Sequence, residues 1–414
     1  MDDGDGEFEV QLGAAFGQAG GGPGPEVTAR LVDGGLAIGR RRRARRRRAV
    51  LLASALTAAV VVGAGALTVP HGVPGQRSDV LDAAHSASPP PPQPLEKGVT
   101  VLLVGLDSTV DAKGRPAPPE LVHGDLHAAV LERNTTDTLM LVRIPAGGGE
   151  VRQLSIPRDV LVPDGHGGQV TINSVYPTAE TAERDRLRQE GLPESELLER
   201  GRGAGRIALL RAVEQLSEVP VDHYAELSMA GFYRAAQALG GVPVCLNRPA
   251  RDDWSGTDLP AGRQELDPAQ ALAFVRQRHG VGDGSDIQRT VRAQALLAGV
   301  VAKLRSGGLL SDPQRLGRLY DALSDQLVVD QGWSPVDFLR QVPALAAGGG
   351  TAVTLPVTLD GIRPRAVPGA AKQLLTGPAP TAAVSSAPLG ERRPGATVTL
   401  QPAPLVWDGV PCVN

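Results

Sequence analysis

The chain has 414 residues, which is enough for two or three domains of average size or for one large domain with appendages. Hydrophobic residues make up 42% of the chain but aromatic residues only 3%, so a core has to be built mainly from Leu, Val and Ala. The formal net charge is −3, although residues 1–48 hold nine Arg against seven acidic residues. The remainder is therefore acidic, which argues against nucleic acid as a partner.

Residues 49–69 form a run of 21 residues without a charge. As a helix this run is roughly 30 Å long, which matches the hydrocarbon thickness of a bilayer. Eight Arg among residues 40–48 precede it, and basic residues beside a span stay on the cytoplasmic side. We expect a transmembrane helix over 49–69, a disordered cytoplasmic tail over 1–48, and an extracellular remainder. A cleaved signal peptide that ends near 64–66 is the alternative.

The folded domain is expected over residues 98–360, between a Pro-rich linker (70–97) and a C-terminal extension (361–414). It begins with VTVLLVGLD (99–107), a continuous apolar run typical of a strand buried on both faces. Further strands are expected at 138–144, 150–156, 223–227 and 242–246. Helices are expected from Ser228 up to Gly240, from Asp267 onward, and at 206–217, 286–304, 312–326 and 334–345. This alternation predicts an α/β fold.

Two charged or Gly-rich segments are interpreted as surface structure. Residues 178–203 are densely charged and are expected to form a surface insertion, and GRGAGR (201–206) is expected to form a loop. The phosphate-loop, nucleophile-elbow and HExxH patterns are absent from the sequence. His123 and His127 lie four residues apart, but their Pro- and Gly-flanked segment does not favour a metal site.

The chain has two cysteines, Cys245 and Cys412, and no CxxC or Cys/His cluster that would indicate a structural zinc site. The expected topology places both cysteines in an oxidising compartment. We expect a disulfide between them that fastens the Pro-rich C-terminal tail to the domain. Two free thiols are the alternative.

Carboxylates stand at the ends of two expected strands. Asp107 ends the first strand, and Asp137 directly precedes the strand at 138–144. Carboxylates at strand ends lie at the rim of a sheet, where α/β proteins place ligands. Arg158 and Asp159, in SIPRDV, follow the end of another apolar strand. Each of these residues could also be an ordinary turn residue.

The segment FVRQRHGVGDGSDIQRTVRAQ concentrates arginines. Arg276 and Arg278 stand at the end of one expected helix. On one side of the next helix, Asp286, Arg289 and Arg292 recur at three-residue spacing. So much positive charge around a short loop favours a bound anion, and the planar fork of Arg suits phosphate. The alternative is a salt-bridged surface.

Several sequence blocks follow one another in the order typical of a known family. They are GLDS (105–108), TDTLML (136–141), SIPRD (155–159), INSVY (172–176), YAELSMAGFYRAAQALGGVPV (224–244), ALAFVRQRHG (271–280) and SDIQRTVRAQ (285–294). With these blocks the chain resembles the LytR-CpsA-Psr (LCP) family of cell wall glycopolymer phosphotransferases. The resemblance implies a three-layer α/β/α domain with a mixed central sheet and an apolar tunnel for a polyprenyl chain.

The resemblance also implies roles for the residues named above. Asp107 and Asp137 fall on acidic positions linked to Mg²⁺, a cation that carboxylates and phosphates hold well. The basic motif positions and the acid that supports them are Arg158, Arg276, Arg278, Arg289, Arg292 and Asp286. This chain departs from the family pattern at Ala293, which replaces a Gln implicated in pyrophosphate contact. The segment between Arg278 and Asp286 is also one residue longer.

The implied activity is transfer of a glycopolymer from a polyprenyl-pyrophosphate carrier to a hydroxyl of peptidoglycan, outside the cytoplasmic membrane. A side activity as a pyrophosphatase is possible for such a site. A non-catalytic glycopolymer-binding scaffold and a membrane-bound transcriptional regulator are the alternatives. Apolar helix residues could line the tunnel or belong to ordinary core, namely Leu209, Val213, Leu216, Phe232, Leu239 and Leu272.

Overall fold

The computed structural model describes residues 76–78, 98–128, 134–146, 150–279, 285–309, 312–335, 338, 349–360, 363–378 and 398–414. All of them belong to one compact unit, Val73–Asn414. The expected cytoplasmic tail (1–48), the expected transmembrane helix (49–69) and most of the helix expected at 334–345 lie outside the described residues. Within the described part, no helix is long and apolar enough to cross a membrane.

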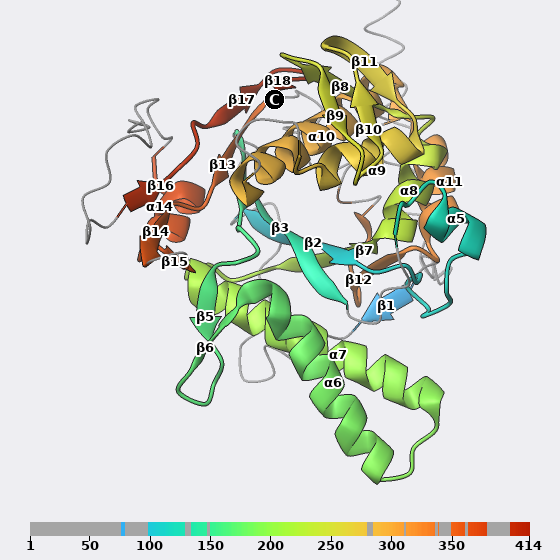
Figure 1. Cartoon of the computed structure of the whole chain (residues 1–414), viewed down its shortest axis with the longest axis vertical. Helices are drawn as coiled ribbons and strands as arrows, with labels where there is room; N and C mark the ends of the chain where they lie inside the picture. The colour runs from blue at the N-terminus through green and yellow to red at the C-terminus, as the bar shows by residue number, and fades with distance from the viewer. Residues whose placement is uncertain are drawn as a thin grey trace, which may run out of the picture. The chain divides into compact units, whose positions relative to one another are not determined.

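A mixed sheet of eight strands forms the centre of the domain (Figure 1). Its strands are β1 (Gln76–Ser78), β2 (Val99–Asp107), β3 (Thr135–Ile144), β4 (Val151–Ser155), β7 (His223–Ser228), β12 (Leu327–Asp330), β13 (Gly350–Thr354) and β17 (Leu405–Trp407). They lie in the order β1-β12-β7-β2-β3-β4-β13-β17, with β2 parallel to β7 and antiparallel to β3. The strands expected at 138–144 and 150–156 are confirmed as β3 and β4, which pair antiparallel, and the mixed central sheet is confirmed with them.

Segments on both sides of residues 98–360 supply edge strands to this sheet. β1 comes from the Pro-rich segment 70–97 and pairs in parallel with β12. β17 comes from the extension 361–414 and pairs antiparallel with β13. The sheet therefore extends beyond the expected domain boundaries, because backbone hydrogen bonding continues into both flanking segments.

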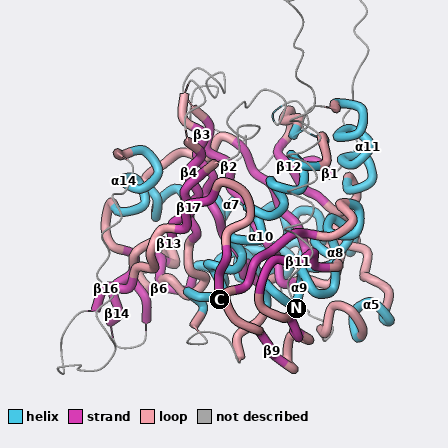
Figure 2. Tube along the Cα trace, turned by 90° about the horizontal axis from the view of Figure 1, so that it is seen from above, coloured by secondary structure: helices cyan, strands magenta, loops and turns pink. Residues whose placement is uncertain are grey.

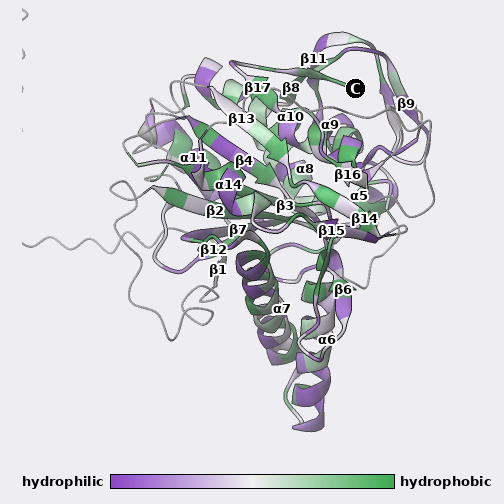
Figure 3. Ribbon diagram, turned by 90° about the vertical axis from the view of Figure 1, so that its left-hand side faces the viewer, coloured by the Kyte–Doolittle hydropathy of each residue, from purple (hydrophilic) through white to green (hydrophobic). Residues whose placement is uncertain are grey.

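One face of the sheet packs on a long helical hairpin. Leu102 and Val104 of β2 belong to the core on this face. The hairpin consists of α6 (Ile172–Gln189) and α7 (Glu194–Ser217), and α14 (Ala370–Thr376) packs on α7 and on β4. The far end of the hairpin projects from the sheet and is mostly hydrophilic (Figure 3).

The hairpin corrects the expectation of a loop at 201–206. These residues are helical, and the charged segment 178–203 forms most of the hairpin. Gly205 lies where α7 faces α6, since a Cβ there would lie 2.8 Å from the ring of Tyr176. Gly201 faces Arg184 in the same way. Close packing of the two helices thus outweighs the low helix propensity of glycine.

Three helices lie over the opposite face of the sheet. They are α8 (Met229–Ala238), α9 (Pro268–Arg276) and α10 (Asp286–Ser306). α8 packs on β7 and β2, α10 packs on β13 and β4, and α9 packs on both helices. Their starts confirm the sequence signals, because Ser228 caps α8 and Asp267 forms a capping box with Gln270 at the start of α9.

A smaller sheet and a hairpin cover the outer side of α9 and α10. The sheet has the order β11 (Gly262–Leu266), β8 (Val242–Leu246), β18 (Cys412–Val413), and the hairpin joins β9 (Ala250–Asp252) to β10 (Thr257–Leu259). α10 thus packs between β8 and the large sheet. Figure 2 shows α10 between β11, the neighbour of β8, and β13 of the large sheet. The remaining elements are α5 (Pro119–His123), β5 (Leu161–Pro163), β6 (Gln169–Thr171), α11 (Pro313–Leu323), β14 (Val357–Asp360), β15 (Arg363–Ala366) and β16 (Val398–Leu400).

A buried ion pair ties α7 to β7. Arg206 donates two hydrogen bonds to the carboxylate of Glu226, at 2.9 and 2.8 Å, and the Tyr224 hydroxyl donates a third at 2.6 Å. Burial raises the pKa of Glu226, but Arg206 and Tyr224 outweigh burial and hold this pKa below its ordinary value. The pair therefore stays charged inside the core and fixes α7 against the sheet.

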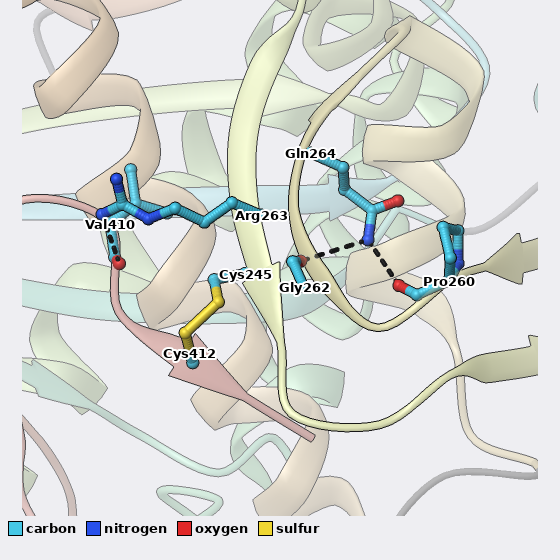
Figure 4. The surroundings of a disulfide bond; sticks show 7 residues. All are labelled: Cys245, Pro260, Gly262, Arg263, Gln264, Val410 and Cys412. Carbon is cyan, nitrogen blue, oxygen red and sulfur yellow. Dashed lines mark hydrogen bonds between the residues drawn. A yellow bond between two sulfur atoms is a disulfide. The ribbon is translucent and has the colours of Figure 1, made fainter. Parts of the chain in front are cut away.

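A disulfide joins Cys245 in β8 to Cys412 in β18 (Figure 4). The two strands are parallel, and the Cα atoms of the paired cysteines lie 4.3 Å apart. Beside the bridge, Arg263 donates a hydrogen bond to the carbonyl of Val410 at 3.3 Å. The C-terminal tail is thereby held on the smaller sheet, as the sequence predicts.

We predict that Cys412→Ser lowers the free energy of unfolding of the full chain by about 2–5 kcal/mol. The bridge links residues 167 positions apart, and Cys412 is exposed, so the substitution removes little besides the bridge. Denaturant unfolding without a reducing agent measures the effect. A reducing agent should lower the wild-type stability to that of the variant. Equal stability of the two proteins under non-reducing conditions would contradict the bridge.

Candidate functional site

A cavity of about 730 Å³ lies between the large sheet and helices α8, α9 and α10. Most of its wall is apolar, with Leu103 and Met140 from the sheet and Leu296 and Val300 from α10 among the lining residues. A cavity of this size and composition suits a ligand with a long apolar body.

The cavity separates the six apolar residues that could line a tunnel or belong to ordinary core into two groups. Three of them line it, namely Phe232, Leu239 and Leu272. The other three, Leu209, Val213 and Leu216, belong to or pack on the core on the opposite face of the sheet, as the alternative of ordinary core predicts. Helical periodicity identifies an apolar face but not the side of the sheet on which the helix packs.

Six of the eight predicted site residues line the same cavity. They are Asp107, Asp137, Arg158, Arg276, Arg278 and Arg289. They come from the end of β2, from β3, from the turn after β4, from the end of α9 and the segment after it, and from the first turns of α10. The four arginines of this set are called the arginine cluster below. Segments far apart in the sequence thus bring the predicted carboxylates and arginines together.

Asp137 holds two members of the arginine cluster. Its Oδ2 atom accepts hydrogen bonds from Arg158 Nη1 at 2.7 Å and from Arg289 Nη1 at 3.0 Å. Arg289 Nη2 also donates to the backbone carbonyl of Asp137 at 2.8 Å. The other carboxylate oxygen, Oδ1, is buried and has no hydrogen-bond partner among the described residues. One oxygen of Asp137 therefore positions arginines, and the other is left to bind something else.

Asp286 supports the arginines from the start of α10. Its Oδ1 atom accepts a hydrogen bond from Arg278 Nη2 at 3.0 Å and lies 3.5 Å from the Nε atoms of Arg158 and Arg289. Burial raises the pKa of Asp286, but a hydrogen bond from the Asp159 carboxyl and the three arginines outweigh burial and lower it. The carboxylate is therefore charged and fixes three guanidinium groups.

The charge balance of the site depends on the protonation of its carboxylates. The arginine cluster faces Asp107, Asp137 and Asp286, Arg158 also lies 3.6 Å from Asp159, and Asp252 lines the cavity beside Arg278. Burial and then the charge of Asp137 raise the pKa of Asp107, so this carboxylate takes up a proton more readily than an ordinary aspartate. Burial and the neighbouring Arg158 lower the pKa of Arg278, which shows that the arginines repel one another. An anion such as phosphate would relieve this repulsion.

Arg292 has a different position from the one expected. Only 1% of it is exposed, and it is not among the residues that line the cavity. Its guanidinium donates hydrogen bonds to the carbonyls of Phe274 at 3.2 Å, of Asn414 at 3.3 Å and of Gln277. The structure therefore corrects the expectation that Arg292 contacts phosphate. Arg292 satisfies carbonyls at the C-terminal end of α9, which have no partners within that helix.

Ala293 lines the cavity one turn beyond Arg289. The adjacent Gln294 points the other way, and its Nε2 atom donates to Ser155 Oγ and to the carbonyl of Val353, both at 3.0 Å. Gln294 therefore ties α10 to the large sheet. At position 293 the cavity wall is a methyl group, which offers no hydrogen bond to a ligand.

Asp252 is a site residue that the sequence analysis did not single out. It is 3% exposed, and its Oδ2 atom accepts hydrogen bonds from the backbone N–H groups of Arg278 at 2.8 Å and His279 at 3.0 Å. These bonds fix the segment that carries Arg278. Asp252 stands between charged neighbours, Arg251 and Asp253, so no local pattern distinguishes it from a surface residue.

Asp107 and Asp137 fit a Mg²⁺ ion. The described residues contain no group of three or more His, Cys, Asp or Glu that could hold a metal ion without other ligands. Mg²⁺ needs fewer protein ligands, because it is commonly held by one or two carboxylates together with phosphate and water. The buried and unpartnered Oδ1 atom of Asp137 is the observation that favours such an ion.

Comparison with curated proteins gives relatives that act in cell wall synthesis. The chain is 42% identical over 263 residues to the cell wall biosynthesis protein LcpA of Corynebacterium glutamicum, covering 63% of this chain and 50% of LcpA. It is 25% identical over 232 residues to the polyisoprenyl-teichoic acid–peptidoglycan teichoic acid transferase TagU of Enterococcus faecalis, covering 56% of this chain and 61% of TagU. The chain thus spans about half the length of the first of these relatives.

The solved structures that are similar to this chain include a LytR-Csp2A-Psr enzyme from Actinomyces oris. The match has a TM-score of 0.46 and 21% identity, and it covers 69% of this chain and 94% of that one. The model of the LytR_cpsA_psr family matches residues 77–352, which is more than half of the chain. The matched range includes Asp107, Asp137 and the whole arginine cluster. The chain therefore belongs to the LytR_cpsA_psr family.

Proposed function

We propose that this chain is a phosphotransferase that moves a glycopolymer from a polyprenyl-pyrophosphate carrier onto a hydroxyl of peptidoglycan. The observation that carries the proposal is the junction of an apolar cavity with the arginine cluster. A polyprenyl pyrophosphate has the same two parts, an apolar chain and a charged head. The names of the relatives LcpA and TagU support the same class of activity.

The residues around the cavity fit the charge changes of phosphoryl transfer. The acceptor hydroxyl forms a bond to the phosphorus that carries the glycopolymer, and the bond from that phosphorus to the bridging oxygen breaks. The polyprenyl phosphate leaves with the bridging oxygen and its electron pair. Arg158, Arg278 and Arg289 would hold the phosphate oxygens and stabilise the negative charge on the leaving group.

Asp107 fits the proton acceptor for the attacking hydroxyl. Burial and the nearby Asp137 raise its pKa, so it takes up a proton more readily than an ordinary aspartate. Asp137 already accepts hydrogen bonds at its Oδ2 atom from Arg158 and Arg289, so it positions these arginines.

Mg²⁺ is proposed as the cofactor, with Asp107 and Asp137 as its protein ligands. When bound, the ion would neutralise charge on the pyrophosphate oxygens. The unpartnered Oδ1 atom of Asp137 supports this assignment.

We further propose that residues 49–69 anchor the protein in the cytoplasmic membrane with the catalytic domain outside. The uncharged run after eight Arg supports this topology. The disulfide between Cys245 and Cys412 agrees with an oxidising compartment. Peptidoglycan, the proposed acceptor, also lies outside the membrane.

We predict that Arg278→Ala lowers kcat/KM for transfer by roughly 10²–10³-fold, the usual cost of removing one donor that stabilises transition-state charge. Arg278 is partly exposed, so its removal should not disturb the core. Turnover of a polyprenyl-pyrophosphate-linked glycan by the full chain measures the effect. Arg188→Ala, on the far end of α6, is the matched control and should leave turnover unchanged.

Arg289→Ala should lose turnover at least as severely, because Arg289 also bonds Asp137. Near-normal turnover by both cavity variants would refute the phosphate site. Tight binding of the lipid-linked glycan without any turnover by the wild type would instead favour the non-catalytic scaffold.

We predict that Asp107→Asn weakens binding of Mg²⁺ to the full chain by at least roughly tenfold, since one of two carboxylate ligands is lost. Isothermal titration calorimetry with MgCl₂ alone measures this affinity independently of turnover. Asp253→Asn, at an exposed position, is the control and should bind Mg²⁺ as the wild type does. Unchanged affinity in Asp107→Asn would exclude Asp107 as a ligand.

We predict that protease added to intact protoplasts removes the domain C-terminal to residue 70. The proposed topology places this domain outside, where the protease reaches it. Immunoblotting with antibody against the domain, before and after lysis, gives the comparison. Protection of the domain in intact protoplasts, or a mature N-terminus near Leu67, would disprove the anchored topology.

A further inference from the structure

An exposed tryptophan stands at the part of the cavity that holds the arginine cluster. Trp254 lines the cavity, yet it is 80% exposed to solvent. The other two tryptophans of the chain, Trp333 and Trp407, are buried. A large apolar ring left in water beside a cavity is typical of a surface that binds a ligand.

Asp252 fixes Trp254 relative to the arginine cluster. The Oδ1 atom of Asp252 accepts a hydrogen bond from the backbone N–H of Trp254 at 3.0 Å, while Oδ2 holds the backbone of Arg278 at 2.8 Å. Within the same turn the hydroxyls of Ser255 and Thr257 are hydrogen bonded at 2.8 Å. One buried carboxylate thus joins the turn that carries Trp254 to the segment that carries Arg278, a member of the arginine cluster. A group attached to the phosphate would lie close to Trp254.

His127 lies against the same turn. A Cβ at Gly256 would lie 2.5 Å from His127 Nε2, so the imidazole packs on the turn that carries Trp254. The backbone of His127 has a φ of 41°, in the left-handed region that residues other than glycine rarely adopt. Its carbonyl accepts a hydrogen bond from Arg276 at 3.5 Å. Backbone strain that is kept at a cavity mouth is typical of ligand-binding positions.

We propose that Trp254 presents a stacking face for a pyranose ring of the substrate, beside the arginine cluster. The proposal rests on the proposed function, in which sugars are attached to the diphosphate and to the acceptor. One face of a pyranose exposes C–H groups, which pack well on the electron-rich face of an indole. The ring could belong to the first sugar of the carried glycopolymer or to a sugar of peptidoglycan.

The surroundings of Trp254 favour a sugar over a membrane surface. Arg251 and Asp253 are largely exposed and form an ion pair at 3.2 Å, next to the indole in sequence. Insertion of Trp254 into lipid would carry this ion pair out of water, which is unfavourable. A stacked pyranose leaves both charges in water.

The test compares two donors and one acceptor with the full chain in detergent. The donors are a polyprenyl diphosphate without sugar and the same diphosphate carrying one pyranose, and the acceptor is a soluble peptidoglycan disaccharide. Trp254→Ala should weaken binding of one sugar-bearing probe by roughly tenfold, on the scale of a truncated aromatic contact. Binding of the sugarless diphosphate should not change. Trp254→Phe should restore most of the affinity, and Val406→Ala, exposed on β17, should bind all probes normally.

The outcomes separate the source of the sugar and the two proposals. Selective loss for the pyranose-bearing diphosphate assigns the ring to the donor, and selective loss for the disaccharide assigns it to the acceptor. Equal affinities of wild type and Trp254→Ala for every probe, or equal losses for every probe, would overturn the sugar assignment. Weaker binding of Trp254→Ala to anionic phospholipid vesicles, together with normal binding of the sugar-bearing probes, would also overturn the sugar assignment. If Arg278→Ala binds both diphosphates as the wild type does, the proposed function itself fails.

Discussion

Helix α10 is the element on which both the fold and the site depend. It lies between the large sheet and the smaller sheet that contains β8. On one side Gln294 bonds Ser155 at the end of β4 and Val353 in β13, and on the other side Gly299 packs directly against the carbonyl of Pro243 in β8. At its N-terminal end, Arg289 bonds both the side chain and the backbone of Asp137. The helix that sets the separation of the two sheets therefore also positions the charged site. The cavity is part of the space that this separation leaves.

The carboxylates of the site have two opposing effects on the binding of an anion. Asp137 and Asp286 hold the guanidinium groups in place, so little conformational entropy is lost when a ligand binds them. They also offset part of the positive charge that attracts an anion. The guanidinium groups still favour an anion, because burial raises the pKa of Asp107 and so weakens the negative charge beside them. The site is thus ordered in advance and still favours a phosphate.

Local signals in the sequence predicted much of the fold. Ser228 and Asp267 cap their helices as expected, and the apolar run at 99–107 is a central strand. The loop expected at 201–206 was wrong because Gly205 is required by the contact with Tyr176, which no local pattern reveals. Capping and alternation depend on neighbours in sequence, whereas helix–helix approach depends on residues that are distant until the chain folds.

The same distinction separates the predicted site residues from those that sequence did not identify. Asp137 and Arg289 stand in recognisable blocks, and the structure brings them together. Arg292 stands in such a block as well, but it is buried and donates to the backbone carbonyls of Phe274 and Asn414, and it does not line the cavity. Asp252 has no block of its own, yet it fixes the segment of Arg278. Residues that contact a ligand can be recognised by their chemistry, whereas residues that position them are defined by contacts formed only on folding. The positions of the guanidinium groups therefore depend on parts of the chain whose sequences carry no catalytic signature.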